Sequence, residues 1–216
     1  HPNLATMLCF IATDASVSVD FLQSALQKAV DHSFNMISVD GDTSPSDCVF
    51  LLANGLSNNQ ADFGNGEAFQ DALDEVCIHL AKSIAQDGEG ATKLIEVTVE
   101  GARHQAEARQ AARTIVSSPL VKAAMHGNDP NWGRIVTALG RSGAEVVEVK
   151  LDISLNGVPV MKQGCPVPFS KEKMRASLQS TRVFIQLYLN LGDGKATAWG
   201  CDLSPEYVKI NSEYTT

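Results

Sequence analysis

Residues 146–161 read VVEVKLDISLNGVPVM, with an apolar run on either side of Asn156 and Gly157. The two runs, 146–155 and 158–161, have the composition of β-strands. Because asparagine and glycine both tolerate the positive φ angles of a type I′ turn, the pair between the runs predicts a β-hairpin. A hairpin pairs its strands antiparallel, so the sheet that contains this one is not purely parallel.

Strand and helix patterns alternate over the rest of the chain. Short apolar runs predict strands, and apolar residues at helical spacing predict helices. The predicted strands are residues 6–11, 47–52, 95–99, 183–191 and 196–201. The predicted helices are residues 22–30, 69–84 and 102–117, and three that open at Ser118-Pro119, at Ser170 and at Ser204-Pro205. Serine before a helical run is a typical N-cap, and proline is well tolerated at the first helical position.

A second hairpin is predicted where Gly192, Asp193 and Gly194 separate the last two strands. Strands that are interleaved with helices but joined partly by tight hairpins favour mixed sheets over a doubly wound parallel sheet. The sequence therefore predicts an α/β protein of the α+β type, in which helices cover mixed β-sheets. It contains no glycine fingerprint for a dinucleotide.

The composition is that of a globular protein and argues against two kinds of partner. The chain has 216 residues, 44% hydrophobic and 19% charged, enough for one large or two small domains with a proper core. Its net charge of -8 argues against a nucleic-acid surface, because phosphate binding needs clustered lysine and arginine. No run approaches the ~20 apolar residues of a membrane span. We therefore expect neither a nucleic acid nor a membrane as partner.

Five scattered cysteines indicate reduced thiols and not a disulfide framework. They are Cys9, Cys48, Cys77, Cys165 and Cys201, and none has the CxxC spacing of a metal site. The histidines show no paired ligand spacing. The sequence therefore predicts no metal and no cofactor.

The segment 87–93, DGEGATK, resembles a phosphate-binding loop only at first sight. It lacks the spacing GxxxxGK[ST] and ends a helix instead of opening one, so no helix N-terminus would face an anion. A glycine helix cap is the simpler interpretation. Glu89, between two glycines, is nevertheless a candidate for binding the amine of a substrate.

Two other clusters have both a structural and a functional interpretation. Residues 126–134, HGNDPNWGR, combine turn formers with an aromatic residue and a cation, and most such loops are turns that lead into a helix. Residues 40–43, DGDT, could coordinate a cation, but the EF-hand register is absent and a turn is simpler.

Thr6 is the candidate nucleophile. It follows Ala5 close to His1, where a natural start would have methionine, and we expect that something upstream is missing. If the Ala5–Thr6 bond were cut in a precursor, Thr6 would carry its own base, because a free α-amino group has a pKa of ~7.7–8.0. The alternative is that Ala5 and Thr6 only open an apolar strand.

Six stretches, in order along the whole chain, resemble the ornithine acetyltransferase family. They are residues 1–8 (HPNLATML), 40–43 (DGDT), 53–55 (ANG), 87–93 (DGEGATK), 129–134 (DPNWGR) and 207–214 (YVKINSEY). Any one of them is weak, but six in sequence make a chance resemblance improbable. The chain is similar to the β-chain of that enzyme, with five residues of the α-chain end attached.

The resemblance implies an activity and a set of site residues. Enzymes of this family move an acetyl group from N-acetylornithine to glutamate in arginine biosynthesis, and some also use acetyl-CoA as donor. Ala5–Thr6 would be the bond at which the precursor cleaves itself, and Thr6 the nucleophile that carries the acetyl group. Glu89, Asn211 and Thr216 would bind the substrate together with Thr6.

The resemblance also implies a partner chain and a fold. The α-chain of the same precursor would complete an αβ heterodimer, assembling to a heterotetramer, and would supply the oxyanion hole. The expected fold is a layered sandwich of the DmpA/ArgJ-like type. Residues 1–140 would hold the nucleophile and part of the substrate site, and residues 141–216 would complete it. We expect the enzyme in the cytoplasm, or in the mitochondrial matrix or plastid of a eukaryote.

Two other functions stay open. An N-terminal-nucleophile hydrolase or aminopeptidase would share Thr6 but let water finish the reaction, whereas a transferase must keep water away from the acyl-enzyme. A noncatalytic amino-acid-binding or assembly subunit would perform no reaction. For the substrate carboxylate, Lys93 is the candidate cation.

Overall fold

The computed structural model describes residues 7–42, 44–57 and 66–213. Contacts between residues divide the chain into two compact units, His1–Ser83 and Ile84–Thr216. The division expected from the sequence is different and falls after residue 140. That division describes which residues contribute to the site, not which residues form a compact unit, and it stays a prediction.

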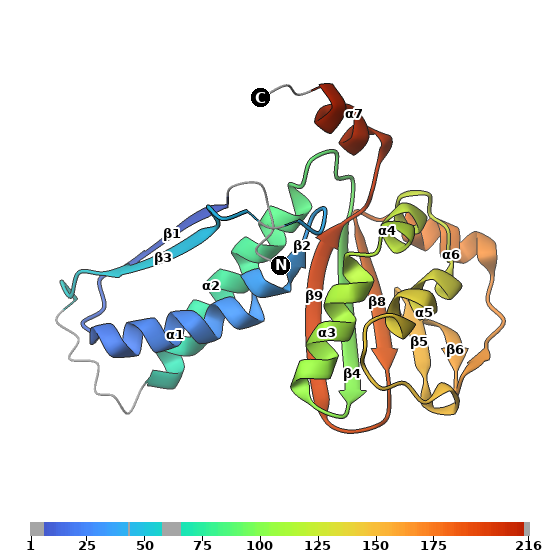
Figure 1. The fold of residues 1–216 in the computed structure, drawn as a ribbon, viewed down its shortest axis with the longest axis horizontal. Helices are drawn as coiled ribbons and strands as arrows, with labels where there is room; N and C mark the ends of the chain where they lie inside the picture. The colour runs from blue at the N-terminus through green and yellow to red at the C-terminus, as the bar shows by residue number, and fades with distance from the viewer. Residues whose placement is uncertain (1–6, 43, 58–65, 214–216) are drawn as a thin grey trace. The chain divides into compact units, whose positions relative to one another are not determined.

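The first unit combines a small parallel sheet with helices (Figure 1). Its elements are β1 (Leu8–Thr13), α1 (Val19–His32), the 3-10 helix η1 (Phe34–Met36), β2 (Ile37–Ser38), β3 (Cys48–Ala53) and α2 (Gly66–Gln86), whose last residues pass into the second unit. β1 and β3 pair in parallel, with Leu8 opposite Cys48. Both strands and both long helices were predicted, although each element is shifted or extended by a few residues.

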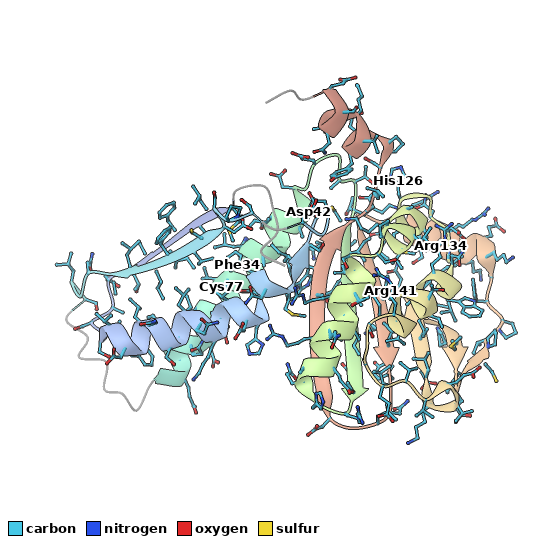
Figure 2. The ribbon with its side chains drawn as sticks, viewed as in Figure 1. Phe34, Asp42, Cys77, His126, Arg134 and Arg141 are labelled. Carbon is cyan, nitrogen blue, oxygen red and sulfur yellow. The ribbon has the colours of Figure 1, made fainter. Side chains whose placement is uncertain are left out.

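The interior of the first unit is packed with small and apolar side chains. Ala29, Phe34 and Cys77 are fully buried; Figure 2 marks Phe34 and Cys77. Burial raises the pKa of the Cys77 thiol to about 11, so Cys77 is a neutral, packed side chain. All five cysteines of the chain are free thiols. On the sheet, Phe10 and Phe50 stack with ring centroids 5.2 Å apart and remain exposed.

The second unit is built on a mixed sheet whose strands lie in the order β9-β4-β8-β5-β6-β7 (Figure 1). The strands are β4 (Leu94–Ala102), β5 (Asp152–Leu155), β6 (Val158–Lys162), β7 (Cys165–Pro166), β8 (Arg182–Tyr188) and β9 (Gly194–Cys201). The helices are α3 (Gln105–Val116), α4 (Pro119–His126), α5 (Trp132–Gly140), the 3-10 helix η3 (Glu148–Lys150), α6 (Lys171–Leu178) and α7 (Pro205–Glu213). The mixed α/β architecture with helices on the sheet confirms the predicted fold class.

The hairpin at Asn156 and Gly157 is confirmed. Their φ angles are 47° and 78°, and β5 and β6 pair antiparallel on either side of them. The first strand is shorter than predicted, because its ladder with β6 begins only at Ile153. The residues before it include the 3-10 helix η3, in which Val149 is exposed, so the apolar run does not mark a buried strand.

The second predicted hairpin is wrong. β8 and β9 follow each other in the chain, but β4 lies between them, parallel to β8 and antiparallel to β9. The connection crosses the end of β4, where the N–H groups of Leu189 and Leu191 donate to the carbonyl oxygens of Glu100 and Gly101 at 2.8 and 2.7 Å. These bonds to a strand far away in the sequence replace the direct pairing that glycine-rich turns usually favour.

α3 covers β4 and β9 (Figure 1). Its buried side includes three fully buried alanines, Ala108, Ala111 and Ala112, and small side chains let a helix approach a sheet closely. The side chain of His104, before its first residue, accepts from the N–H of Glu107 at 3.3 Å. Among the helices of the described part of the chain, none has a stretch long and apolar enough to cross a bilayer.

Candidate functional site

Glu89 and Asn211 meet on the surface of the second unit. Glu89 lies in the loop between α2 and β4, and Asn211 lies on α7. The amide nitrogen Nδ2 of Asn211 donates to Oε2 of Glu89 at 2.7 Å and to the carbonyl oxygen of Tyr207 at 2.9 Å. Both side chains are exposed. Two of the residues that the family resemblance assigns to the substrate are therefore neighbours, and their role stays a prediction.

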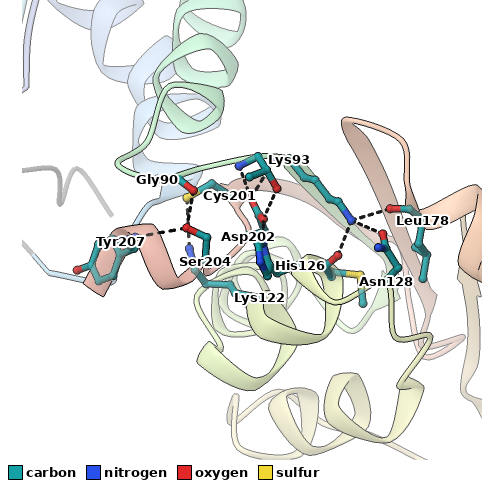
Figure 3. Close-up of polar contacts among 12 residues, drawn as sticks. Gly90, Lys93, Lys122, His126, Asn128, Leu178, Cys201, Asp202, Ser204 and Tyr207 are labelled. Atoms are coloured by element: carbon teal, nitrogen blue, oxygen red, sulfur yellow. Dashed lines mark hydrogen bonds and ion pairs between the residues drawn. The ribbon is translucent and has the colours of Figure 1, made fainter. Parts of the chain in front are cut away.

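The loop that carries Glu89 is attached to Asp202, at the end of β9 (Figure 3). Oδ1 of Asp202 accepts from the N–H groups of Thr92 and Lys93 at 2.7 and 2.8 Å. Oδ2 accepts from Oγ1 of Thr92 at 2.6 Å and contacts Nδ1 of His126 at 2.7 Å. A fully buried carboxylate with four partners links the loop, β9 and α4.

The same contacts set the protonation of Asp202. Burial alone would raise the pKa of this carboxyl, but hydrogen bonds from Thr92, from His126 and from two backbone N–H groups outweigh burial and lower the pKa below its ordinary value. Asp202 is therefore a stable anion. Because it accepts the N–H groups of Thr92 and Lys93, those groups are engaged and cannot cradle a phosphate.

Lys93 is not available to bind a substrate carboxylate. Its side chain is 7% exposed, and its Nζ donates to the carbonyl oxygens of Met125 and Leu178 at 2.7 Å each and to Oδ1 of Asn128 (Figure 3). An ammonium has three hydrogens, so all of them are used. Burial lowers the pKa of Lys93, and the nearby charge of Asp202 opposes that change. The geometry assigns Lys93 a structural role.

Most of the segment 126–134 forms a turn that enters α5, as its structural interpretation predicted. Asn128 has a φ of 54°, and the N–H of Asp129 donates to the carbonyl oxygen of Ala124 at 2.8 Å. Arg134, labelled with His126 in Figure 2, donates from Nη1 to the carbonyl oxygen of Leu120 at 3.0 Å and so joins α5 to α4. His126 is the exception, because its one-third exposed side chain contacts Asp202.

Ala5, Thr6 and Thr216 lie outside the described residues. The first described residue, Met7, follows Thr6 directly in the chain. Its N–H donates to Oδ1 of Asp47 at 2.8 Å, and its carbonyl oxygen accepts from the N–H of Cys48 at 2.8 Å. The beginning of β1 is therefore fixed to β3 immediately after the candidate nucleophile.

Within residues 7–42, 44–57 and 66–213, no group of three or more His, Cys, Asp or Glu residues is arranged to hold a metal ion. Residues 40–42 of the DGDT segment form a local turn, in which the N–H of Asp42 donates to Oδ1 of Asp40 at 2.9 Å.

Sequence reasoning missed Asp202 altogether and identified Ser204 only as a helix cap. The partners of Asp202 in the loop lie about 110 positions away in the chain, so no local pattern marks them. The serine before Pro205 was the one local signal in this segment.

Comparison with known protein families matches residues 1–216 to the ArgJ family. The chain belongs to the ArgJ family. An arginine biosynthesis bifunctional protein ArgJ from Dehalococcoides mccartyi is 56% identical over 219 residues, which cover 100% of this chain and 54% of that protein. A protein of the same description from Bacillus cereus (strain ATCC 14579) is 51% identical over 219 residues, which again cover 100% of this chain and 54% of that protein.

A solved structure shows the same fold. The crystal structure of an arginine biosynthesis bifunctional protein ArgJ from Bacillus halodurans matches with a TM-score of 0.94 and 46% identity, over 97% of this chain and 100% of that one. The chain spans about half the length of the curated ArgJ relatives that it matches. The fold is thus the ArgJ fold that the resemblance implied.

Proposed function

We propose that this chain is the β-chain of a glutamate N-acetyltransferase, which moves an acetyl group from N-acetylornithine to glutamate in arginine biosynthesis. One observation carries the proposal: Glu89 and Asn211, substrate residues by the motif match, are in contact within a chain that matches the ArgJ family over its whole length. The relatives are described as bifunctional proteins of arginine biosynthesis, which agrees with the proposal.

Thr6 would perform the chemistry in two half-reactions. The α-amine of Thr6 takes the hydroxyl proton, Oγ1 attacks the acetyl carbonyl, and the amine of ornithine leaves with a proton. The amine of glutamate then attacks the acetyl-threonine ester, which releases N-acetylglutamate and restores the hydroxyl. A positioned base contributes ~10²–10⁴-fold to such a rate. The base exists only if the Ala5–Thr6 bond has been cut, so self-cleavage is part of the proposal.

The Glu89 carboxylate suits the ammonium of an amino-acid substrate. Its exposed side chain is open to a ligand, and the amide of Asn211 orients Oε2 without neutralising the charge. A charge-assisted hydrogen bond to a carboxylate is roughly twice as strong as a neutral one. Thr216 would complete this group of substrate residues.

The α-chain would supply the oxyanion hole. An oxyanion-hole donor contributes ~10²–10³-fold, and we propose that the α-chain provides it in an αβ heterodimer that assembles to a heterotetramer. The chain by itself would then be inactive. The cytoplasm is the proposed location, and acetyl-CoA is the proposed second donor that would account for a bifunctional description.

The assembled protein, incubated with N-acetylornithine with and without glutamate, tests the proposal. We expect N-acetylglutamate and ornithine in equal amounts, and little acetate without glutamate. Acetate release that is rapid and indifferent to glutamate would favour the hydrolase, and no turnover at all would favour the noncatalytic binding subunit. Replacing N-acetylornithine by acetyl-CoA tests the second donor.

Variants of Thr6 test whether its hydroxyl is the nucleophile. Thr6→Ser keeps a hydroxyl and should retain some cleavage and turnover, whereas Thr6→Ala should lose both, since covalent catalysis needs the hydroxyl. Intact mass of the protein mixed with N-acetylornithine should show one acetyl group on the chain that begins at Thr6. Unchanged turnover of Thr6→Ala would rule out the assignment.

A further inference from the structure

The segment that joins β9 to α7 binds the Glu89 loop at a second point, Ser204. The hydroxyl of Ser204 donates to the carbonyl oxygen of Gly90 at 2.6 Å and accepts from the N–H of Tyr207 at 3.3 Å (Figure 3). One side chain therefore caps the first turn of α7 and ties that turn to the residue next to Glu89.

The loop and the helix are also in direct contact. Gly90 has a φ of +66°, and a Cβ atom at this position would lie 2.5 Å from the backbone nitrogen of Tyr207 and 2.9 Å from Oγ of Ser204. Only a residue without a side chain fits this approach. The backbone beside Glu89 thus packs against the beginning of the helix that carries Asn211.

Asp202 anchors the other end of the loop. Its carboxylate engages Thr92 and Lys93, three and four residues after Glu89, while Ser204 engages Gly90. Asp202 and Ser204 are separated by one residue, so a single short segment sets the path of the loop and the start of α7. Because an α-helix is stiff over two turns, the start of α7 determines where the amide of Asn211 lies.

Neither anchor has the geometry of a group that touches substrate. Ser204 is 5% exposed, and both partners of its hydroxyl are backbone groups. Asp202 is 2% exposed, and its two oxygens already have four partners. Any effect of these residues on a reaction must pass through the groups that they position.

We propose that Ser204 and Asp202 are positioning residues for substrate binding, which keep Glu89 and Asn211 at hydrogen-bond distance across the loop and α7. The proposal rests on the proposed function, because it takes Glu89 and Asn211 as the residues that bind the substrate amine. Loss of the Ser204 link raises KM for N-acetylornithine and leaves kcat nearly unchanged, because the binding contact is made in the ground state and the transition state alike.

Ser170 offers a matched control. Its hydroxyl caps α6 by accepting from the N–H of Lys173 at 3.3 Å, the same distance and offset at which Ser204 accepts from Tyr207. Ser204→Ala and Ser170→Ala therefore remove caps of the same geometry, one at a buried and one at an exposed serine, but only the former removes a bond to the Glu89 loop. Ser204→Thr keeps the hydroxyl.

The first experiment measures KM and kcat of the assembled enzyme with each variant. We expect Ser204→Ala to raise KM for N-acetylornithine about tenfold with kcat within about twofold, since one buried hydrogen bond is lost. Ser170→Ala and Ser204→Thr should keep the wild-type KM. A wild-type KM for Ser204→Ala, or an equal rise for Ser170→Ala, would overturn the proposal.

A double-mutant cycle tests whether Ser204 acts through Glu89. In a Glu89→Gln background, where KM is already high, Ser204→Ala should add less than about twofold, because coupled residues are not additive. A full tenfold increase on top of Glu89→Gln would mean that Ser204 acts elsewhere, and the proposal would fail.

Amide hydrogen exchange decides the positioning role without any substrate. In the assembled protein, Ser204→Ala should speed exchange of the amides of residues 88–93, and Ser170→Ala should leave them unchanged. If the wild-type protein transfers no acetyl group, the proposed function fails. The exchange rates would still show whether the hydrogen bond from Ser204 to Gly90 holds the Glu89 loop in place. Unchanged exchange in Ser204→Ala would refute the link even in an active enzyme.

Discussion

The Nζ atom of Lys93 lies 2.7 Å from the carbonyl oxygen of Leu178, a residue 85 positions later in the chain, and this bond joins the start of β4 to the end of α6. Lys93→Met would leave that oxygen and Oδ1 of Asn128 without the ammonium, whereas the carbonyl oxygen of Met125 still accepts from the N–H of Asn128. We expect the free energy of unfolding to fall by about 2 kcal/mol or more, because a buried unpaired acceptor costs about 1–3 kcal/mol. Urea unfolding followed by far-UV circular dichroism measures it.

Lys195→Met is the control for Lys93→Met. Lys195 is exposed and pairs with Glu100 at 2.8 Å, and surface ion pairs contribute little to stability. Lys195→Met should therefore leave the urea midpoint of unfolding almost unchanged. If Lys93→Met is as stable as the wild type but has a much higher KM, Lys93 binds the substrate carboxylate after all.

Gly90→Ala should damage the site more than a substitution at another glycine with a positive φ. Gly157 has a φ of +78° and open space around it, whereas Gly90 faces the backbone of Tyr207. Both alanines carry the cost of a left-handed backbone, about 1 kcal/mol, but only the one at position 90 also pushes α7 away. We expect a raised KM for Gly90→Ala and a normal one for Gly157→Ala. Equal values would show that the contact is unimportant.

Asp202 makes the stability of the folded protein depend on pH in the acidic range. Its pKa is lower in the folded protein than in the unfolded chain, so its contribution is complete above the ordinary carboxyl pKa of about 4 and is lost as the pH falls through the folded value. Asp202→Asn should flatten the fall of the melting temperature below about pH 4, because position 202 no longer titrates. Asp193→Asn, in an exposed turn, serves as the control. A curve for Asp202→Asn that is parallel to the wild type would contradict this account.

Asn156 contributes more than a turn conformation. Its Oδ1 accepts from the N–H of Phe184 at 2.8 Å, and its Nδ2 donates to the carbonyl oxygen and the hydroxyl of Ser177 at 3.1 and 3.0 Å. Asn156→Gly keeps the turn accessible but removes these bonds to β8 and α6, so we expect a loss of about 1–3 kcal/mol. Thermal unfolding measures the loss. Stability equal to the wild type would mean that only the turn matters.

Local signals in the sequence predicted the elements that depend on local interactions. The Asn156-Gly157 turn, the caps at Ser170 and Ser204 and the alanine face of α3 all rest on neighbours within a few residues, and all are present. The order of the strands in the sheet could not be predicted from short stretches of sequence. Gly192 and Gly194 indicate a tight turn equally well whether the flanking strands pair with each other or with a third strand.

The candidate site divides in the same way. Glu89 and Asn211 are predicted as substrate residues because they lie in recognisable motifs, but their contact spans 122 positions and is visible only in the folded chain. Asp202 stands in an ordinary strand end and carries no motif. Its function as an anchor follows from its burial and its four partners, which are tertiary properties.

The place of β4 between β8 and β9 has a consequence for how the chain acquires its structure. Both neighbours of β4 are synthesised long after β4 itself, and a bond such as that from Nε1 of Trp199 to Glu96 joins residues 103 positions apart. Pairings between residues so far apart in the sequence form slowly, because closing a large loop costs conformational entropy before any contact stabilises it. Until β8 and β9 have been synthesised, both edges of β4 are open, and a nascent chain that stalls before β9 would expose one of them to aggregation.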